Sequence, residues 1–275
     1  MDSGPQARFY GRACTMTIWV TERPDAEQVA EAALGWVLSN MRRILATQPR
    51  CSLALAGGST PRRLYEMMRD LPEGQLEGGR IDLFLGDERT VPPDHPDSNE
   101  RMVRQSLLEG WPGERPTLYA VPYVAGDPVQ SAQRYAAVLE EYGQRNHCLS
   151  EAGPWPRLDL VLLGLGDDGH TASLFPGNIA LRERQQGVVA TWVERMGCNR
   201  ISMTLPLFLD AARIAFLVCG ASKRQALEAS WNGPRDLMLY PTQQIAPREE
   251  LHWLIDAACA PSRLPDGFQR VDRIL

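Results

Sequence analysis

The sequence contains no run of about 20 consecutive apolar residues and no long run of either charge. The first absence excludes a membrane-spanning helix, and residues 1–15 lack the basic-then-apolar order of a secretory signal. We therefore expect a cytoplasmic protein. The second absence, with a formal net charge of −5, argues against binding to nucleic acid or to an anionic membrane. At this coarse level the net charge also disfavours an anionic substrate.

Several chemical motifs are missing as well. The six cysteines form no CxxC pair, which argues against a redox or zinc motif and, in a reducing compartment, against disulfides. The four histidines show neither HxH nor HExxH spacing, so we expect no metal centre. Because no dinucleotide fingerprint is present either, we expect no cofactor. The absence of a P-loop and of a GxSxG nucleophile elbow argues against P-loop nucleotide binding and a serine hydrolase. The cysteines are Cys14, Cys51, Cys148, Cys198, Cys219 and Cys259.

Short apolar runs alternate with helical patterns along the chain. Strands are predicted at 52–56, 81–85, 158–163, 200–205, 213–219 and finally 251–256. Helices are predicted at 25–47, from 61 onward, at 98–108, at 131–142 and at 222–230. Asp25 and Gln28 have the spacing of a capping box, and Ser98 is a plausible N-cap.

This alternation predicts an α/β fold with a mostly parallel, Rossmann-like central sheet covered by helices on both faces. Without repeats or Gly/Ser linkers, residues 1–275 are expected to form one domain, with a small appended subdomain as the alternative. Ligands bind such sheets beyond the carboxyl ends of the strands. Functional residues are therefore expected in the loops that follow residues 56, 85, 163 and 219.

Two of these loops combine glycines with a helix start. In the segment 57–61 the glycines permit close approach of the backbone, and Thr60 is the predicted N-cap. In the segment 220–224, Ser222 and Gln225 have the spacing of a capping box.

Basic residues occupy the first turn of both predicted helices, where the macrodipole disfavours cations. They are Arg62 and Arg63 in one helix and Lys223 and Arg224 in the other. An anion bound by the helix amides resolves this conflict. Ordinary turn geometry and solvated cations are the alternative interpretation.

The loop 164–173 is the most informative. Asp168 stands two residues before His170, so its carboxylate can fix the imidazole tautomer for proton transfer near neutral pH. This segment resembles a GxGxxG fingerprint only superficially, because it is acidic where a pyrophosphate would bind. In the loop after residue 85, Asp87 and Arg89 can lie on one side of an extended segment and pair. His95, in the same loop, is interpreted as a surface residue.

Taken together, the loops resemble those of the family of 6-phosphogluconolactonases and glucosamine-6-phosphate deaminases. The matching segments run in family order between residues 51 and 258, and GLGDDGHTASLFPG at 164–177 is the most specific of them. The others are 55–61, 86–92 with 97–99, 200–206, 220–223 and 253–258.

The resemblance implies hydrolysis of 6-phospho-D-glucono-1,5-lactone to 6-phosphogluconate in the oxidative pentose phosphate pathway, without a required metal. It places the catalytic base at His170, its orienting carboxylate at Asp168, and an active-site pair at Asp87 and Arg89. The implied phosphate-side contacts are Gly57, Gly58, Ser59, Thr60, Arg200 and Lys223. The implied partner is a small phosphorylated lactone, and one phosphate needs only a local basic cluster.

Two alternatives remain open within the resemblance. In the deaminases a glutamate five residues after the loop histidine supports proton relay, and here that position is Phe175, which favours the lactonase. A non-catalytic sugar-phosphate sensor is less compatible, because no basic DNA-binding segment is evident. The segment 193–199 lacks the prolines common before the family arginine, so the loop presenting Arg200 is expected to differ.

Overall fold

The computed structural model describes residues 16–271. Its centre is an eight-stranded sheet in the order β11-β1-β10-β9-β6-β2-β3-β5, in which all neighbouring strands are parallel. The strands are β1 (Thr17–Arg23), β2 (Cys51–Leu55), β3 (Ile81–Leu85), β5 (Thr117–Tyr119), β6 (Leu160–Gly164), β9 (Arg213–Val218), β10 (Glu250–Asp256) and β11 (Phe268–Arg270). This confirms the predicted fold class.

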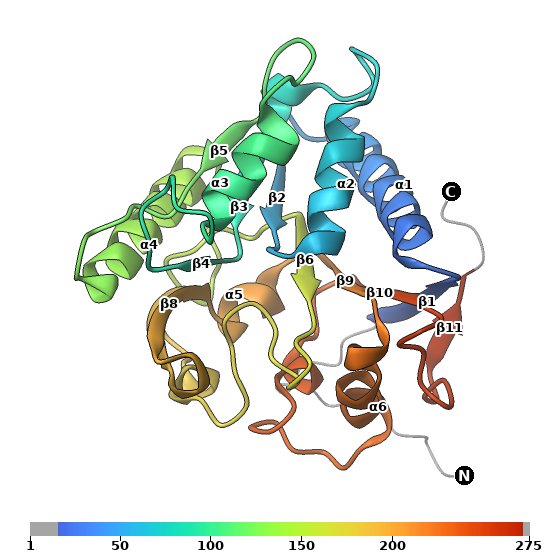
Figure 1. Ribbon diagram of the computed structural model, residues 1–275. Helices are drawn as coiled ribbons and strands as arrows, with labels where there is room; N and C mark the ends of the chain where they lie inside the picture. The colour runs from blue at the N-terminus through green and yellow to red at the C-terminus, as the bar shows by residue number, and fades with distance from the viewer. Residues whose placement is uncertain (1–15, 272–275) are drawn as a thin grey trace.

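Helices lie on both sides of the central sheet (Figure 1). Figure 1 shows α1 and α2 above the sheet and α6 below it, so the middle strands are covered on both faces. This explains why β2 and β3 consist of unalternating, fully buried residues. The helices are α1 (Ala26–Leu45), α2 (Ser59–Arg69), α3 (Asn99–Val103), α4 (Pro128–Arg145), α5 (Leu205–Asp210) and α6 (Arg224–Asn232).

A smaller antiparallel sheet adjoins the carboxyl end of β3. It has the order β4-β8-β7, with β4 at Asp87–Arg89, β7 at Val188–Val193 and β8 at Cys198–Met203. β4 begins directly after Gly86, whose carbonyl accepts a hydrogen bond of 2.9 Å from the backbone N–H of Met203. The polar segment 86–97 is therefore not only a loop as predicted, because pairing with β8 makes its first residues a strand.

Two of the predicted N-caps are present in the structure and a third is not. Asp25 caps α1 as expected, since its carboxylate accepts from the backbone and the side-chain amide of Gln28. Ser98 likewise caps α3 by accepting from the backbone N–H of Arg101. The prediction for Thr60 is wrong: α2 begins at Ser59, and its N-cap is Gly58, with a positive φ of 108° that favours glycine.

Other corrections concern short elements that local patterns do not reveal. The predicted Ser222 capping box is wrong, because Ala221–Lys223 forms a 3₁₀ turn and Lys223 precedes α6 without a side-chain cap. The strand at β10 does not end the sheet, since β11 adds a parallel neighbour to β1. The helix after Ser98 becomes a π-helical turn at Arg104–Leu108. The elements β1, β5, β7 and α5 were not predicted.

Two buried tyrosines anchor the strand ends that carry the functional loops. The Tyr65 hydroxyl of α2 accepts from the backbone N–H of Ala56 at 3.0 Å and donates to its carbonyl at 2.9 Å. The Tyr135 hydroxyl of α4 makes the same pair of bonds with Leu85, both at 2.9 Å. Both side chains are fully buried, so each hydroxyl satisfies backbone groups that water cannot reach.

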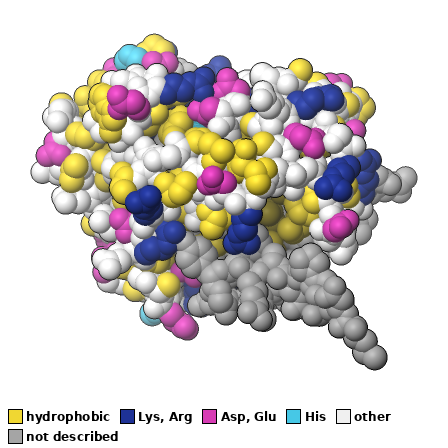
Figure 2. Space-filling view, turned by 90° about the horizontal axis from the view of Figure 1, so that it is seen from below, with side chains coloured by type: hydrophobic (Ala, Val, Ile, Leu, Met, Phe, Trp, Pro, Cys, Tyr) yellow, Lys and Arg dark blue, Asp and Glu magenta, His cyan; other side chains and the backbone are white. Residues whose placement is uncertain are grey.

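Figure 2 shows basic and acidic side chains interspersed over the lower face of the molecule. Within residues 16–271, no helix is long and apolar enough to cross a membrane. Cys14 and the N-terminal segment 1–15 lie outside the described residues.

Candidate active site

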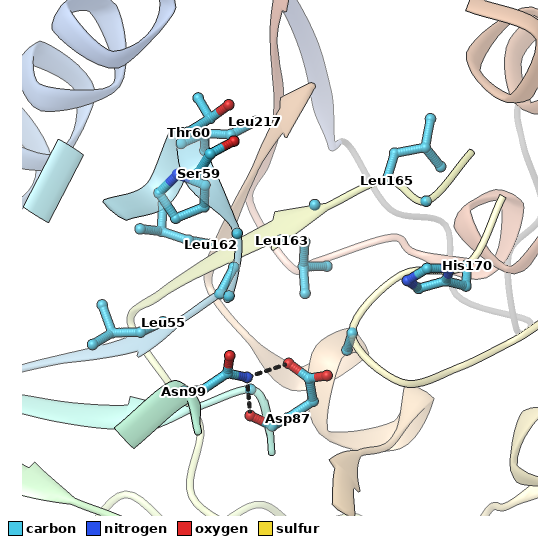
Figure 3. A pocket seen from close by; sticks show the side chains of 18 of the residues that line it. Leu55, Ser59, Thr60, Asp87, Asn99, Leu162, Leu163, Leu165, His170 and Leu217 are labelled. Carbon is cyan, nitrogen blue, oxygen red and sulfur yellow. Dashed lines mark hydrogen bonds between the residues drawn. The ribbon is translucent and has the colours of Figure 1, made fainter. Parts of the chain in front are cut away.

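A cavity of about 290 Å³ opens beyond the carboxyl ends of the adjacent strands β9, β6, β2 and β3. The four loops selected from the sequence all contribute to its lining, although they are far apart in the chain. Figure 3 shows Ser59 and Thr60 on one side of this space, Asp87 and Asn99 on another, and His170 on a third. The four loops therefore meet at one cavity.

His170 and Asp168 form a closely coupled pair in the loop after β6. Nδ1 of His170 lies 2.5 Å from Oδ1 of Asp168, which also accepts the backbone N–H of His170 at 3.2 Å. The ring of Phe175 stacks on the imidazole, with centroids 4.2 Å apart. Because Nδ1 is engaged, Nε2 is the nitrogen left for chemistry in the cavity, and Figure 3 shows a ring nitrogen directed into that space.

The acidity of Asp168 reflects competing influences. Partial burial raises the pKa of this carboxyl, but hydrogen bonds from His170 and from Arg195 outweigh it and hold the pKa well below its usual value. Asp168 is therefore a carboxylate at neutral pH and can stabilise a positive charge on the imidazole.

Asp87 is fixed by neighbours on both of its oxygens. Ser173 Oγ donates to Oδ2 at 2.6 Å, and Asn99 Nδ2 donates to Oδ1 at 3.3 Å and to the backbone carbonyl at 2.9 Å (Figure 3). Asn99 in turn occupies the space that a Cβ on Gly57 would fill, with Oδ1 at 2.5 Å. Gly57 thus serves close packing as well as the turn.

The predicted pairing of Asp87 with Arg89 is wrong. Both residues line the cavity, but Arg89 donates from Nη1 to the carbonyl of Asp97. The residue between them, Glu88, points the other way and is buried. Its carboxylate accepts backbone N–H groups of Asn99 and Glu100, which ties the start of α3 to β4.

Asn99 and Glu88 were missed as contributors to the site. Both belong to segments that matched the family, but neither has a spacing that identifies a partner. The sequence indicated Asn99 only indirectly. Ser98 as an N-cap places the residue that follows it at the start of a helix close to the loop.

The predicted cations separate into two groups. Lys223, which is the only lysine in the sequence, lines the cavity together with Arg89. Arg63 instead pairs with Glu27 of α1 at 2.6 Å, and Arg224 donates to the carbonyls of Ala257 and Ala258. These two basic residues therefore need no bound anion.

Arg200 does not line the cavity. Its Nη2 lies 3.1 Å from Sδ of Met196, and its Nε is buried without a hydrogen-bond partner among the described residues. Arg200 is directly opposite Arg89 in the pairing of β4 with β8, so it lies beside the site rather than in it. Its role as a phosphate contact stays a prediction.

The remaining histidines and the cysteines take no part in the proton-transfer pair. His252 is buried and bonded through Nε2 to Thr21 Oγ1 at 2.8 Å, as expected of a structural histidine. Cys219 lines the cavity, but burial raises the pKa of its thiol to about 11. The five described cysteines are free thiols, and within residues 16–271 no cluster of three or more His, Cys, Asp or Glu side chains is suited to a metal ion.

The chain is similar to known proteins over most of its length. Residues 24–253 match the family model described as glucosamine-6-phosphate isomerases/6-phosphogluconolactonase. The chain is 39% identical over 235 residues to a 6-phosphogluconolactonase of Nostoc sp., covering 86% of this chain and 94% of that one. It is 40% identical over the same length to a 6-phosphogluconolactonase of Synechocystis sp., with the same coverage.

A solved structure is also similar to this fold. The 6-phosphogluconolactonase from Trypanosoma brucei superimposes with a TM-score of 0.73 at 27% identity, covering 90% of this chain and 98% of that one. The chain belongs to the family of glucosamine-6-phosphate isomerases and 6-phosphogluconolactonases.

Proposed function

We propose that this protein hydrolyses 6-phospho-D-glucono-1,5-lactone to 6-phospho-D-gluconate, a step of the oxidative pentose phosphate pathway. The observation that carries the proposal is the His170–Asp168 pair, with Nδ1 held at 2.5 Å and the ring facing a cavity that also contains Lys223. The two relatives at 39% and 40% identity, both named 6-phosphogluconolactonase, support the same activity.

His170 acts as the general base. Nε2 takes a proton from water as the water oxygen attacks C1 of the lactone, while Asp168 holds the Nδ1 proton and stabilises the imidazolium. The tetrahedral intermediate then collapses, the bond between C1 and the ring oxygen breaks, and His170 returns its proton to that oxygen. The sum is addition of one water molecule, so His170 and Asp168 end in their starting states.

Charged groups around the cavity contact different parts of the substrate. Arg89 offsets the negative charge that develops on the carbonyl oxygen, and Asp87 accepts a hydrogen bond from a sugar hydroxyl. Lys223 and the backbone amides of 57–60 at the start of α2 hold the phosphate. Binding of the phosphate positions C1 of the lactone near His170. Contacts far from the reacting carbon therefore help to orient it for attack.

Phe175 favours hydrolysis over deamination. Its ring stacks on His170 at 4.2 Å, at the position where the deaminases have a glutamate for proton relay. An aromatic ring has no proton to exchange, so this loop supports a histidine that works with Asp168 alone.

The test is an assay on freshly generated lactone, corrected for its spontaneous hydrolysis. We expect His170→Ala to lower kcat by about 10²- to 10⁴-fold, the usual contribution of a general base. His147→Asn is the matched control, because His147 has a positive φ of 54° that asparagine tolerates and lies outside the cavity. Hydrolysis no faster than the spontaneous rate, or ammonia release from glucosamine 6-phosphate, would refute the proposal.

A further inference from the structure

Arg195 contacts the catalytic pair from outside the cavity. It lies in the 3₁₀ turn Glu194–Met196 between β7 and β8, and Gly197 ends this turn in a left-handed conformation with φ 59°. Its Nη1 lies 2.7 Å from Oδ2 of Asp168 and 3.3 Å from Oδ1 of Asp167. Arg195 is not among the residues that line the cavity. It was not identified from the sequence, because the turn has no family motif.

The two oxygens of Asp168 therefore have different partners. Oδ1 contacts Nδ1 of His170 at 2.5 Å, and Oδ2 accepts from Arg195 at 2.7 Å. With both oxygens engaged, the carboxylate cannot rotate without losing a charge-assisted hydrogen bond. The small antiparallel sheet thus supplies a guanidinium to a carboxylate that belongs to a loop of the central sheet.

We propose that Arg195 is a positioning residue that, through Asp168, fixes the orientation of His170 and limits how strongly the imidazole holds a proton. This proposal rests on the proposed function, because it concerns the histidine that is proposed there as the general base. A lone carboxylate beside an imidazole favours the imidazolium, which cannot act as a base. A guanidinium on the far oxygen offsets part of that negative charge, so it weakens the preference of the carboxylate for an imidazolium at His170.

Other charges near His170 do not replace this contribution. Asp167 also contacts Arg195, and Lys223 from the turn before α6 and Asp87 and Arg89 from β4 line the same cavity. Within residues 16–271 none of these groups makes a hydrogen bond to the Asp168 carboxylate, and all of them are unchanged in an Arg195 variant. A loss of Arg195 is therefore expected to act on His170 through Asp168.

If Arg195 only stabilised the fold, its removal would lower the unfolding midpoint. The Arg195 side chain is 56% exposed, and ion pairs at that exposure contribute little to stability. We therefore expect the unfolding midpoint of Arg195→Met to match the wild type. The effect should be on the titration of His170 and on turnover instead.

The test is a histidine Cε1 NMR titration of the ligand-free full chain, with the His170 signal assigned from its absence in His170→Gln. We expect Arg195→Met to move the His170 midpoint upward by about half a pH unit, the size of effect typical of losing one partly exposed cation. In Arg195→Lys, which keeps a positive charge, the His170 midpoint should lie close to that of the wild type. Arg69→Met, which removes a surface pair with Asp70 on α2, is the control and should leave it unmoved.

Kinetics give a second readout. The acidic limb of kcat/KM should move upward with the NMR midpoint, and kcat should fall while KM stays constant, because Arg195 does not line the cavity. An unchanged His170 midpoint in Arg195→Met overturns the proposal, as does a rise in KM at constant kcat. The NMR result does not depend on lactone hydrolysis, so its failure and that of the proposed function are distinguishable.

Discussion

Gly166 is the residue on which the geometry of the catalytic pair depends most directly. A Cβ at this position would lie 2.1 Å from Nδ1 of His170 and 2.5 Å from Oδ1 of Asp168. These atoms belong to the hydrogen bond itself, so neither can move away without breaking it. The glycine is therefore required by close approach and not by its own backbone angles.

Gly166→Ala is expected to lower kcat by at least about tenfold, because it displaces a general base whose contribution is 10²- to 10⁴-fold. Gly164→Ala is the comparison for the His170 signal, since a Cβ there meets no atom within 4 Å. Because Gly164 lines the cavity, the kcat of Gly166→Ala is compared with that of the wild type. The measurement is steady-state kinetics on both variants, together with the His170 NMR signal. A Gly166→Ala enzyme as active as the wild type would contradict this interpretation of the loop.

At the scale of elements, α2 and α4 each secure the end of a strand through a tyrosine hydroxyl. Tyr65→Phe removes the buried hydroxyl that satisfies both the N–H and the carbonyl of Ala56. We expect a loss of about 1–3 kcal/mol in the free energy of unfolding, the cost of unsatisfied buried polar groups. KM should also rise, because Ala56 directly precedes the 57–60 loop.

Denaturant unfolding and lactone kinetics measure the two effects of Tyr65→Phe. Tyr123→Phe is the control, because Tyr123 is 37% exposed and substitutions at exposed positions change stability little. Equal stability of the two variants would show that the hydroxyl of Tyr65 does not anchor the strand end.

At the scale of the whole molecule, the two sheets are expected to unfold together. β4 follows β3 after a single residue, and the Gly86 carbonyl accepts from Met203 of β8. Far-UV circular dichroism and tryptophan fluorescence should therefore give coincident denaturation curves. Trp192 reports on the small sheet and Trp253 on the central one. Two separate transitions would favour the appended subdomain that the sequence left open.

The net charge of −5 was too coarse a guide to the substrate. Only Arg89 and Lys223 of the predicted basic residues line the cavity, and the start of α2 adds backbone amides. A single phosphate depends on such local charges within a few ångströms and not on the total, because salt screens distant ones. The predicted absence of nucleic-acid and membrane partners stays a prediction.

The local sequence was sufficient to predict the main parallel strands, the caps at Asp25 and Ser98, and the His170–Asp168 pair. Each depends on neighbours within a few residues, so periodicity and spacing reveal it. The strand β4, the Ser173 and Asn99 bonds to Asp87, and the Arg195 contact with Asp168 became evident only in the folded molecule. The side-chain contacts among them join residues 12 to 86 positions apart, and the pairing of β4 with β8 joins segments still farther apart in the chain. A short-range sequence pattern does not indicate which distant side chains the packing of two sheets brings together.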